Sequence, residues 1–178
     1  MTDGTASAAL LKLEQALAQW RQWRVQPPLP GAPHVVEALG GGSSNHTFLV
    51  EAAGRRYVVR IDRVNPAANG ISRQAEWRVL RHAAGRGIAP RARYFNPDLG
   101  VLVCDYLAPD AGAEATVAQL AGLLRSLHEL PAIHYRMEPA ERIRRYEHQL
   151  PPRWESLKAF SPRLLNALEQ TDPGAPAV

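Results

Sequence analysis

The order of its local patterns constrains this chain most: a helical pattern, three strand-like runs, a second helical pattern and two more strand-like runs come before Val117, and only helical patterns follow. The strand-like runs are rich in β-branched and aromatic residues and are bounded by glycine or proline. They are Val35–Leu39, Thr47–Glu51, Arg56–Ile61, Arg91–Phe95 and Val101–Leu107. Strands grouped ahead of helices favour an α+β fold with a five-stranded, mainly antiparallel sheet.

Apolar residues repeated every three or four positions predict the helices, since that spacing marks one helix face. The expected helices cover about residues 7–24, 72–85, 117–127, 143–150 and 164–168. Proline and glycine stand where these patterns stop, as they do at many helix ends. The last two helices are separated by Pro151 and Pro152, and we expect the final one to expose apolar side chains.

The composition fits one globular domain and excludes several classes of protein. The chain has 178 residues, 46% of them hydrophobic and 21% charged, which is enough to build a sizeable core. A single cysteine, Cys104, excludes an intramolecular disulfide and suits a reducing compartment. No secretory signal or membrane-length apolar run is present, so we expect a cytoplasmic protein without a membrane partner.

The net charge of +4 does not point to nucleic acid. The arginines are spread along the chain instead of forming one block, and no nucleic-acid-binding motif accompanies them. A nucleic-acid partner is therefore not expected.

A glycine-rich turn, Gly40 to Asn45, joins the first two predicted strands. Without Cβ atoms, its backbone N–H groups can approach and surround phosphate oxygens, and the serine and asparagine side chains can add donors. A flexible hairpin loop is the plain alternative, and the turn alone does not decide between them. It is neither a Walker P-loop nor a dinucleotide fingerprint, because no Gly-Lys-Ser/Thr follows and the chain enters a strand.

Two charged residues follow the turn in a suggestive order. Alternation along the third strand puts Arg60 on the face opposite Val59 and Ile61, and Glu76 lies in the first turns of the next helix. Each residue alone is more typical of a solvated surface. Together with the turn, they have the order in which a kinase small lobe pairs a phosphate-binding cation with a helix carboxylate.

Three segments carry a resemblance to a known family: Leu39–Val50, Arg56–Ile61 and Ile71–Glu76. They resemble the small lobe of the aminoglycoside phosphotransferase and choline kinase superfamily, and look closest to its choline and thiamine kinase branch. Farther along, Gly87–Pro90, Val101–Leu107 and Leu124–Pro131 resemble the family's later strands, hinge and first large-lobe helix. The resemblance spans roughly residues 36–131.

The resemblance implies a protein-kinase-like small lobe, with five antiparallel strands and a helix, followed by the first helices of an incomplete large lobe. In this interpretation residues 1–31 form an N-terminal helix and linker, and residues 32–107 form the small lobe. Residues 108–178 hold the hinge and a partial helical lobe that ends before the catalytic loop.

The resemblance also implies the binding residues and the cofactor, ATP. The turn would cover the phosphates, Arg60 would replace the usual lysine and pair with Glu76, and the hinge would meet the adenine edge. The residues concerned are Gly41, Gly42, Ser43, Ser44, Asn45, Arg60, Glu76, Asp105, Tyr106 and Leu107. The implied activity is ATP-dependent phosphorylation of a hydroxyl on a small, amine-bearing molecule.

One departure from the family concerns catalysis. Members continue into a His-x-Asp-x-x-x-x-Asn loop and a magnesium-binding Asp, and none of the Asp residues here fits that pattern. We therefore assign no catalytic residue and no metal ligand, expect magnesium only in a complete family member, and expect these residues alone to be inactive. A C-terminal half is then an expected partner, and a non-catalytic nucleotide- or partner-binding module stays open as an alternative.

Overall fold

A computed structural model describes residues 3–40, 44–63, 65–67, 70–110, 112, 114–133 and 138–170. The chain divides into two compact units. The first unit holds residues 1–64 and 73–133, and the second holds residues 65–72 and 134–178. This division does not test the lobe boundaries expected at residues 31 and 107.

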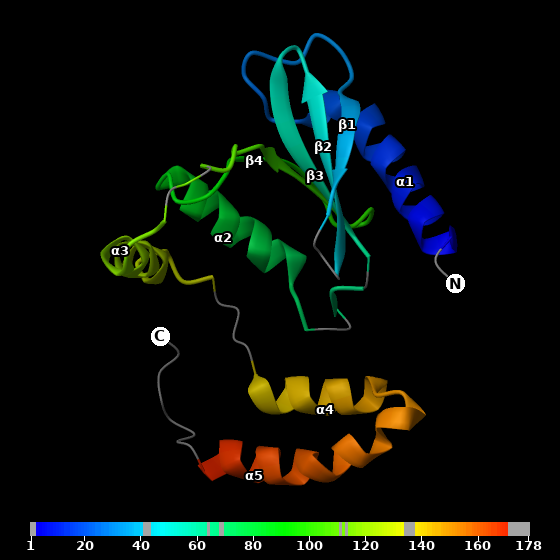
Figure 1. The fold of residues 1–178 in the computed structure, drawn as a ribbon, viewed down its shortest axis with the longest axis vertical. Helices are drawn as coiled ribbons and strands as arrows, with labels where there is room; N and C mark the ends of the chain where they lie inside the picture. Colours follow the sequence, from blue (N-terminus) through cyan, green and yellow to red (C-terminus); the bar gives the residue numbers. More distant parts are fainter. Residues whose placement is uncertain are drawn as a thin grey trace. The chain divides into compact units, whose positions relative to one another are not determined.

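The first unit is built on a five-stranded sheet with the order β1-β2-β3-β5-β4 (Figure 1). Its strands are β1 (His34–Leu39), β2 (Asn45–Ala52), β3 (Arg55–Asp62), β4 (Ala92–Asn96) and β5 (Val101–Asp105). All neighbouring strands run antiparallel. The α+β fold class and the antiparallel sheet expected from the sequence are therefore confirmed.

Glycines form the two tight turns of this sheet. Gly54 has a φ of 71° in the β2–β3 turn and Gly100 a φ of 66° in the β4–β5 turn, a conformation that glycine adopts at little cost. At Gly100 an added Cβ would also lie 3.1 Å from the Asp62 side chain. The turn therefore lets the backbone come close to the end of β3, where the Asp62 N–H donates to the Gly100 carbonyl at 2.8 Å.

Strand alternation gives the sheet two different faces. On β3, Tyr57, Val59 and Ile61 are almost fully buried and face the main core, while the intervening residues face the other side. Helix α1 (Asp3–Ala18) covers the core face (Figure 1) and contributes Leu13 and Ala16 to it. The main core thus lies between α1 and the sheet face that carries Tyr57, Val59 and Ile61. We call this the outer face, and the opposite one, which carries Arg60, the inner face.

The first helix ends earlier than the sequence predicted. We expected it to reach about residue 24, but α1 stops at Ala18 and a short 3₁₀ helix, η1 (Trp20–Gln22), follows. The bend turns Trp23 into the core, where its ring packs edge-on against Tyr57 at 5.5 Å. The sequence pattern does not reveal this bend, because Trp23 continues the apolar helical spacing past Trp20.

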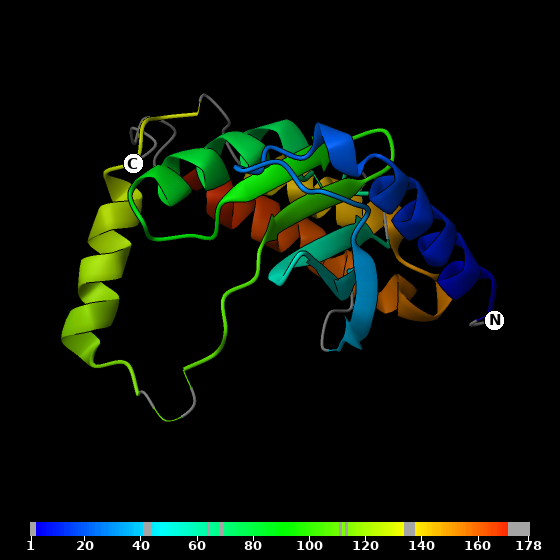
Figure 2. The same ribbon diagram turned by 90° about the horizontal axis from the view of Figure 1, so that it is seen from above.

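Helix α2 (Arg73–Gly85) lies on the other side of the sheet from α1 (Figures 1 and 2). Its bounds agree with the predicted ones. Helix α3 (Val117–His128) begins at a capping box made by Thr116 and Gln119, which the sequence analysis did not use. It lies beside the end of α2, where Arg86 pairs with Glu129 at 3.1 Å, and its apolar side chains remain exposed.

The second unit is helical. It contains α4 (Pro139–Gln149), a 3₁₀ helix η3 (Pro152–Phe160) and α5 (Ser161–Gln170). The 3₁₀ helix was not predicted, since only the prolines that precede it gave a signal. Leu164 on α5 is 52% exposed, in line with the apolar surface expected there. Among the described residues, no helix combines the length and apolar character needed to span a membrane.

The role of α1 in the core is testable with two matched substitutions. Leu13 is 3% exposed and Leu11 on the same helix is 57% exposed. We expect Leu13→Ala to lower the free energy of unfolding by about 2–4 kcal/mol through a buried cavity. Leu11→Ala should change it by less than about 0.5 kcal/mol. Equal effects in urea denaturation would contradict a core that includes α1.

Candidate functional site

The expected ion pair between β3 and α2 is present. Arg60 leaves the face of β3 opposite the main core, and Glu76 lies in the first turn of α2. Arg60 Nη1 donates to Glu76 Oε1 at 2.5 Å and Nη2 donates to Oε2 at 2.9 Å. The planar guanidinium therefore grips the carboxylate with two parallel bonds, a geometry that a lysine ammonium cannot reproduce.

Arg73 extends this pair into a network, and the sequence analysis gave it no role. Its Nη1 donates to Glu76 Oε2 at 2.5 Å, and its Nε donates to Asp62 Oδ2 at 3.0 Å. Its Nη2 also contacts Asp62 Oδ1. The available signal was the spacing of three between Arg73 and Glu76, which places both on one helix face. The pairing with Asp62 had no local signal, because it depends on how α2 lies against the end of β3.

The same arginine reaches the exit of the glycine-rich turn. Arg73 Nη2 lies 3.3 Å from Asn45 Oδ1. Since an arginine only donates, the oxygen of the amide must face it, which leaves the Asn45 amide N–H₂ directed elsewhere. Beside it, the Ser44 carbonyl accepts from the Arg63 N–H at 3.1 Å. The predicted residues Gly41, Gly42 and Ser43 lie outside the described residues.

These contacts fix the charge state of the network. Burial alone would raise the pKa of the Glu76 carboxyl, but hydrogen bonds and charge from Arg60 and Arg73 outweigh it and lower the pKa below its ordinary value. Burial likewise opposes the charge of Arg73, yet its bonds to Asp62 and Glu76 raise its pKa. The charged forms of Glu76 and Arg73 are therefore favoured, and the formal charges of the two arginines and the two acids cancel.

Arg60 keeps an unused donor within this neutral network. Its Nε is buried and has no hydrogen-bond partner within the described part of the chain. A buried donor without a partner costs about 1–3 kcal/mol, so such groups usually meet water or a ligand. Nε–H is therefore a donor left for a bound group on this face of the sheet.

The face around Arg60 is otherwise apolar. Leu49, Leu102 and Cys104 are buried there, and the register places them on the same side as Arg60. Burial raises the pKa of the Cys104 thiol to about 11. The thiol therefore stays protonated at neutral pH, which suits a packing residue.

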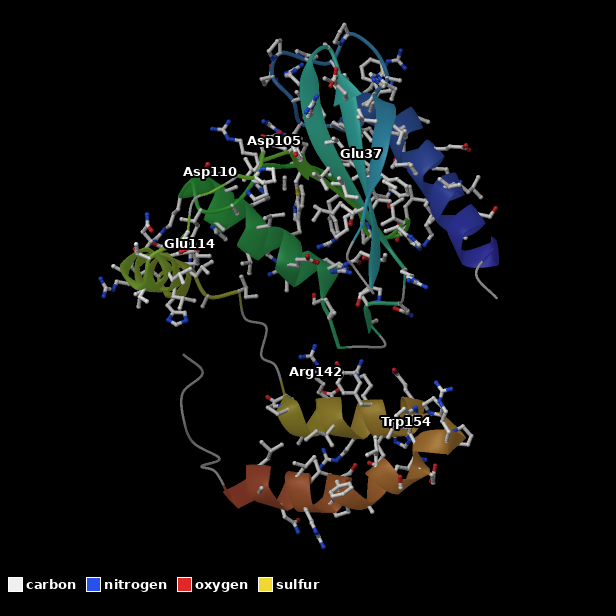
Figure 3. All side chains as sticks on the ribbon, viewed as in Figure 1. Glu37, Asp105, Asp110, Glu114, Arg142 and Trp154 are labelled. Carbon is white, nitrogen blue, oxygen red and sulfur yellow. The ribbon has the colours of Figure 1, made fainter. Side chains whose placement is uncertain are left out.

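The predicted hinge follows β5, and its first residue is held by an arginine. Asp105, labelled in Figure 3, receives two hydrogen bonds of 2.6 Å from Arg93. Its N–H donates to the Arg91 carbonyl at 2.9 Å, and the Tyr106 N–H donates to the Arg56 carbonyl at 3.1 Å. These two N–H groups therefore already donate hydrogen bonds within the protein. Leu107 is 63% exposed and is the predicted hinge residue whose N–H has no partner among the described residues.

The described residues offer no metal centre. No group of three or more His, Cys, Asp or Glu side chains is gathered among them. Asp62 is the carboxylate nearest the turn, but both of its oxygens accept from Arg73. The network is thus suited to holding anions through cations and backbone donors.

Comparison with known proteins decides the family. A sequence model described as the phosphotransferase enzyme family matches residues 35–178. The chain belongs to this family. The resemblance seen in the sequence is therefore confirmed, and the Arg60–Glu76 pair lies within the matched region.

The fold is supported by one of two similar solved structures, a choline kinase. A choline kinase, LicA from Streptococcus pneumoniae, is 21% identical with a TM-score of 0.54, over 75% of this chain and 53% of that one. A choline/ethanolamine kinase family protein from Mesorhizobium loti is 22% identical with a TM-score of 0.48, over 89% of this chain and 54% of that one. The chain thus spans about half the length of these proteins. A search of curated proteins found no match.

The network can be tested through its dependence on pH. Glu76→Gln removes the negative charge between two half-buried arginines, and we expect a loss of about 2 kcal/mol in unfolding free energy at pH 7. Because folding lowers the Glu76 pKa, its contribution is full above the ordinary value of 4.5 and is lost as the pH falls below it. The difference in unfolding free energy between the wild type and Glu76→Gln should therefore become smaller at acidic pH.

Glu129→Gln is the matched control, since Glu129 forms an exposed pair with Arg86. We expect it to change stability by less than about 0.5 kcal/mol at either pH. Denaturant titrations at pH 7 and pH 4 provide the comparison. A gap for Glu76→Gln that is the same at both pH values would contradict the proposed charge state.

Proposed function

We propose that this chain is the ATP-binding portion of a small-molecule kinase of the choline or thiamine kinase type. The observation that carries the proposal is the bidentate Arg60–Glu76 pair on the face of the sheet next to the exit of the glycine-rich turn. In the register, Arg60 lies opposite Thr47, two residues beyond Asn45. A cation held this close to a glycine-rich turn suits a phosphate tail.

The donors left free by the network support phosphate binding. Arg60 Nε–H and the Asn45 amide N–H₂ are not used by the protein within the described residues. Both are held in place by charged partners, so little side-chain entropy is lost when they bind a phosphate oxygen. The network carries no net charge, and the charge of a triphosphate would have to be balanced by magnesium, as expected for a complete family member.

Adenine has a place between the turn and the hinge. The side chains of Leu49, Leu102 and Cys104 make the sheet beside Arg60 apolar. At the end of β5, the Leu107 N–H and the neighbouring carbonyls can pair with the ring edge. We propose this strip, with Asp105 and Tyr106 as its fixed support, as the adenine contact.

The residues here bind but do not complete a catalytic centre. They include no His-x-Asp-x-x-x-x-Asn segment, so a base and magnesium ligands have to come from elsewhere in the whole protein. The apolar side chains exposed on α3 give such a segment a surface to cover. We therefore propose a hydroxyl on a small amine-bearing molecule as the substrate of the whole protein, which works in the cytoplasm. We expect no phosphoryl transfer by these residues alone.

ATP binding to the chain tests the proposal. We expect isothermal titration calorimetry to give a dissociation constant of about 0.1–1 mM for ATP, because half of the site is present. Arg60→Met should weaken binding by about tenfold or more, since a charged donor is lost from the phosphates. Choline phosphorylation measured in the same samples should remain at background.

Arg56→Met is the matched control, because Arg56 lies on the same strand and pairs with Glu51 near the β2–β3 turn. It should leave ATP binding unchanged. No ATP binding at about 5 mM, or equal losses in the two variants, would contradict the kinase interpretation and favour a module that binds a partner instead.

A further inference from the structure

A small cavity lies where α1 meets the ends of β2 and β3. Its volume is about 60 Å³. It is lined by Ala8, Ala9 and Lys12 of α1, by His46 of β2, by Asp62 at the end of β3 and by Arg63 after it. Lys12 and Arg63 are the cations of this lining, and Asp62 is its acid.

The cavity is distinct from the Arg60 site. His46 pairs with Ile61 in the register, so its side chain leaves the sheet on the face that α1 covers. Arg60 is opposite Thr47 and points to α2. A group bound in the cavity and a group bound at Arg60 would therefore lie on opposite faces of the same two strands.

The polar groups of the cavity lack partners. His46 Nε2 is buried and has no hydrogen-bond partner in the described part of the chain. Lys12 is half-buried, and neither it nor Arg63 has an acidic side-chain partner there. Asp62 also lines the cavity, but its two oxygens are occupied by Arg73. The lining thus has two cations without an acidic partner and a histidine with an unpartnered Nε2, which donates in the tautomer that carries its proton there. An oxyanion satisfies such groups.

The cavity has room for a small ion. Its volume is about 60 Å³, and about 10–15 Å³ measured in the same way is enough for one water. Part of the lining comes from α1, which precedes the family match over residues 35–178. The site therefore depends on a segment that is outside the matched region.

We propose that this cavity binds a small tetrahedral oxyanion with the chemistry of inorganic phosphate. Lys12 and Arg63 supply the charge, and the His46 ring donates from the sheet. Because Arg63 also bonds through its N–H to the Ser44 carbonyl, the anion links α1 to the end of the glycine-rich turn. Binding only to the folded chain, it stabilises this junction in proportion to its concentration.

The lysine content of the chain makes a direct test possible. Its lysines are Lys12 and Lys158, and Lys158 pairs with Glu155 at 2.9 Å. Amine acylation is followed at each lysine by mass spectrometry while phosphate replaces chloride at constant ionic strength. We expect Lys12 acylation to slow by about threefold or more, with a midpoint at low millimolar phosphate, while Lys158 is unaffected.

Variants separate binding from folding. By calorimetry, Lys12→Met should weaken phosphate binding by about tenfold and Lys12→Arg should largely retain it. Lys158→Met should have no effect, and circular dichroism checks that each variant is folded. Arg60→Met should leave the protection of Lys12 intact, so that failure of ATP binding and failure of this site are distinguishable.

Several results would overturn the proposal. They are equal protection of both lysines, no protection at about 50 mM phosphate, or unchanged phosphate affinity in a folded Lys12→Met protein. The first would show general screening of charge, the second would show that the cavity binds no phosphate, and the third would show that phosphate binds without Lys12.

Discussion

The inner face of the sheet depends on one ionic network, formed by Arg60, Glu76, Arg73 and Asp62. It joins the middle of β3 to the first turn of α2 and passes from there to the end of β3 and to Asn45. Each member is partly shielded from water, so removing one leaves a charge without its partner in a poorly solvated place. The network thus holds helix, sheet and turn in one fixed relation.

The two faces of the sheet have different roles: the outer face forms the core, and the inner face carries the proposed binding groups. The outer face is closed by α1 with a continuous apolar core, which supplies most of the hydrophobic stabilisation of the first unit. The inner face carries the ionic network and leaves donors free. Because side chains alternate along each strand, a single segment such as Val59-Arg60-Ile61 serves both faces.

The two anion-binding proposals follow from the same geometry. The β2–β3 pair ends beside the glycine-rich turn, and it presents Arg60 to one side and His46 to the other. In one case a neighbouring carboxylate orients the cation and a donor remains unused. In the cavity, Lys12 and Arg63 do not pair with a carboxylate of the described residues, so a bound anion would balance their charge. Both proposals therefore rest on donors that the protein does not satisfy internally.

The sequence by itself determined the fold class, the strand runs, α2 and the Arg60–Glu76 pair, because each has a local signal. Periods of two and of three to four residues report which side of a strand or helix is buried, and glycine and proline mark the ends. The family resemblance added the order of these parts. The predicted helix extended to about residue 24, whereas α1 ends at Ala18, and this difference at its C-terminal end has a tertiary cause, since the chain bends at Trp20 to bury Trp23.

Only the tertiary structure decided the partners that are distant in the chain. Arg73 bonds to Asn45 across 28 positions, and Arg93 binds the carboxylate of Asp105. The cavity between α1 and His46 likewise unites residues with no common local pattern. Such contacts depend on how the helices lie against the sheet. Packing of the whole core sets that arrangement, and a local sequence pattern does not report it.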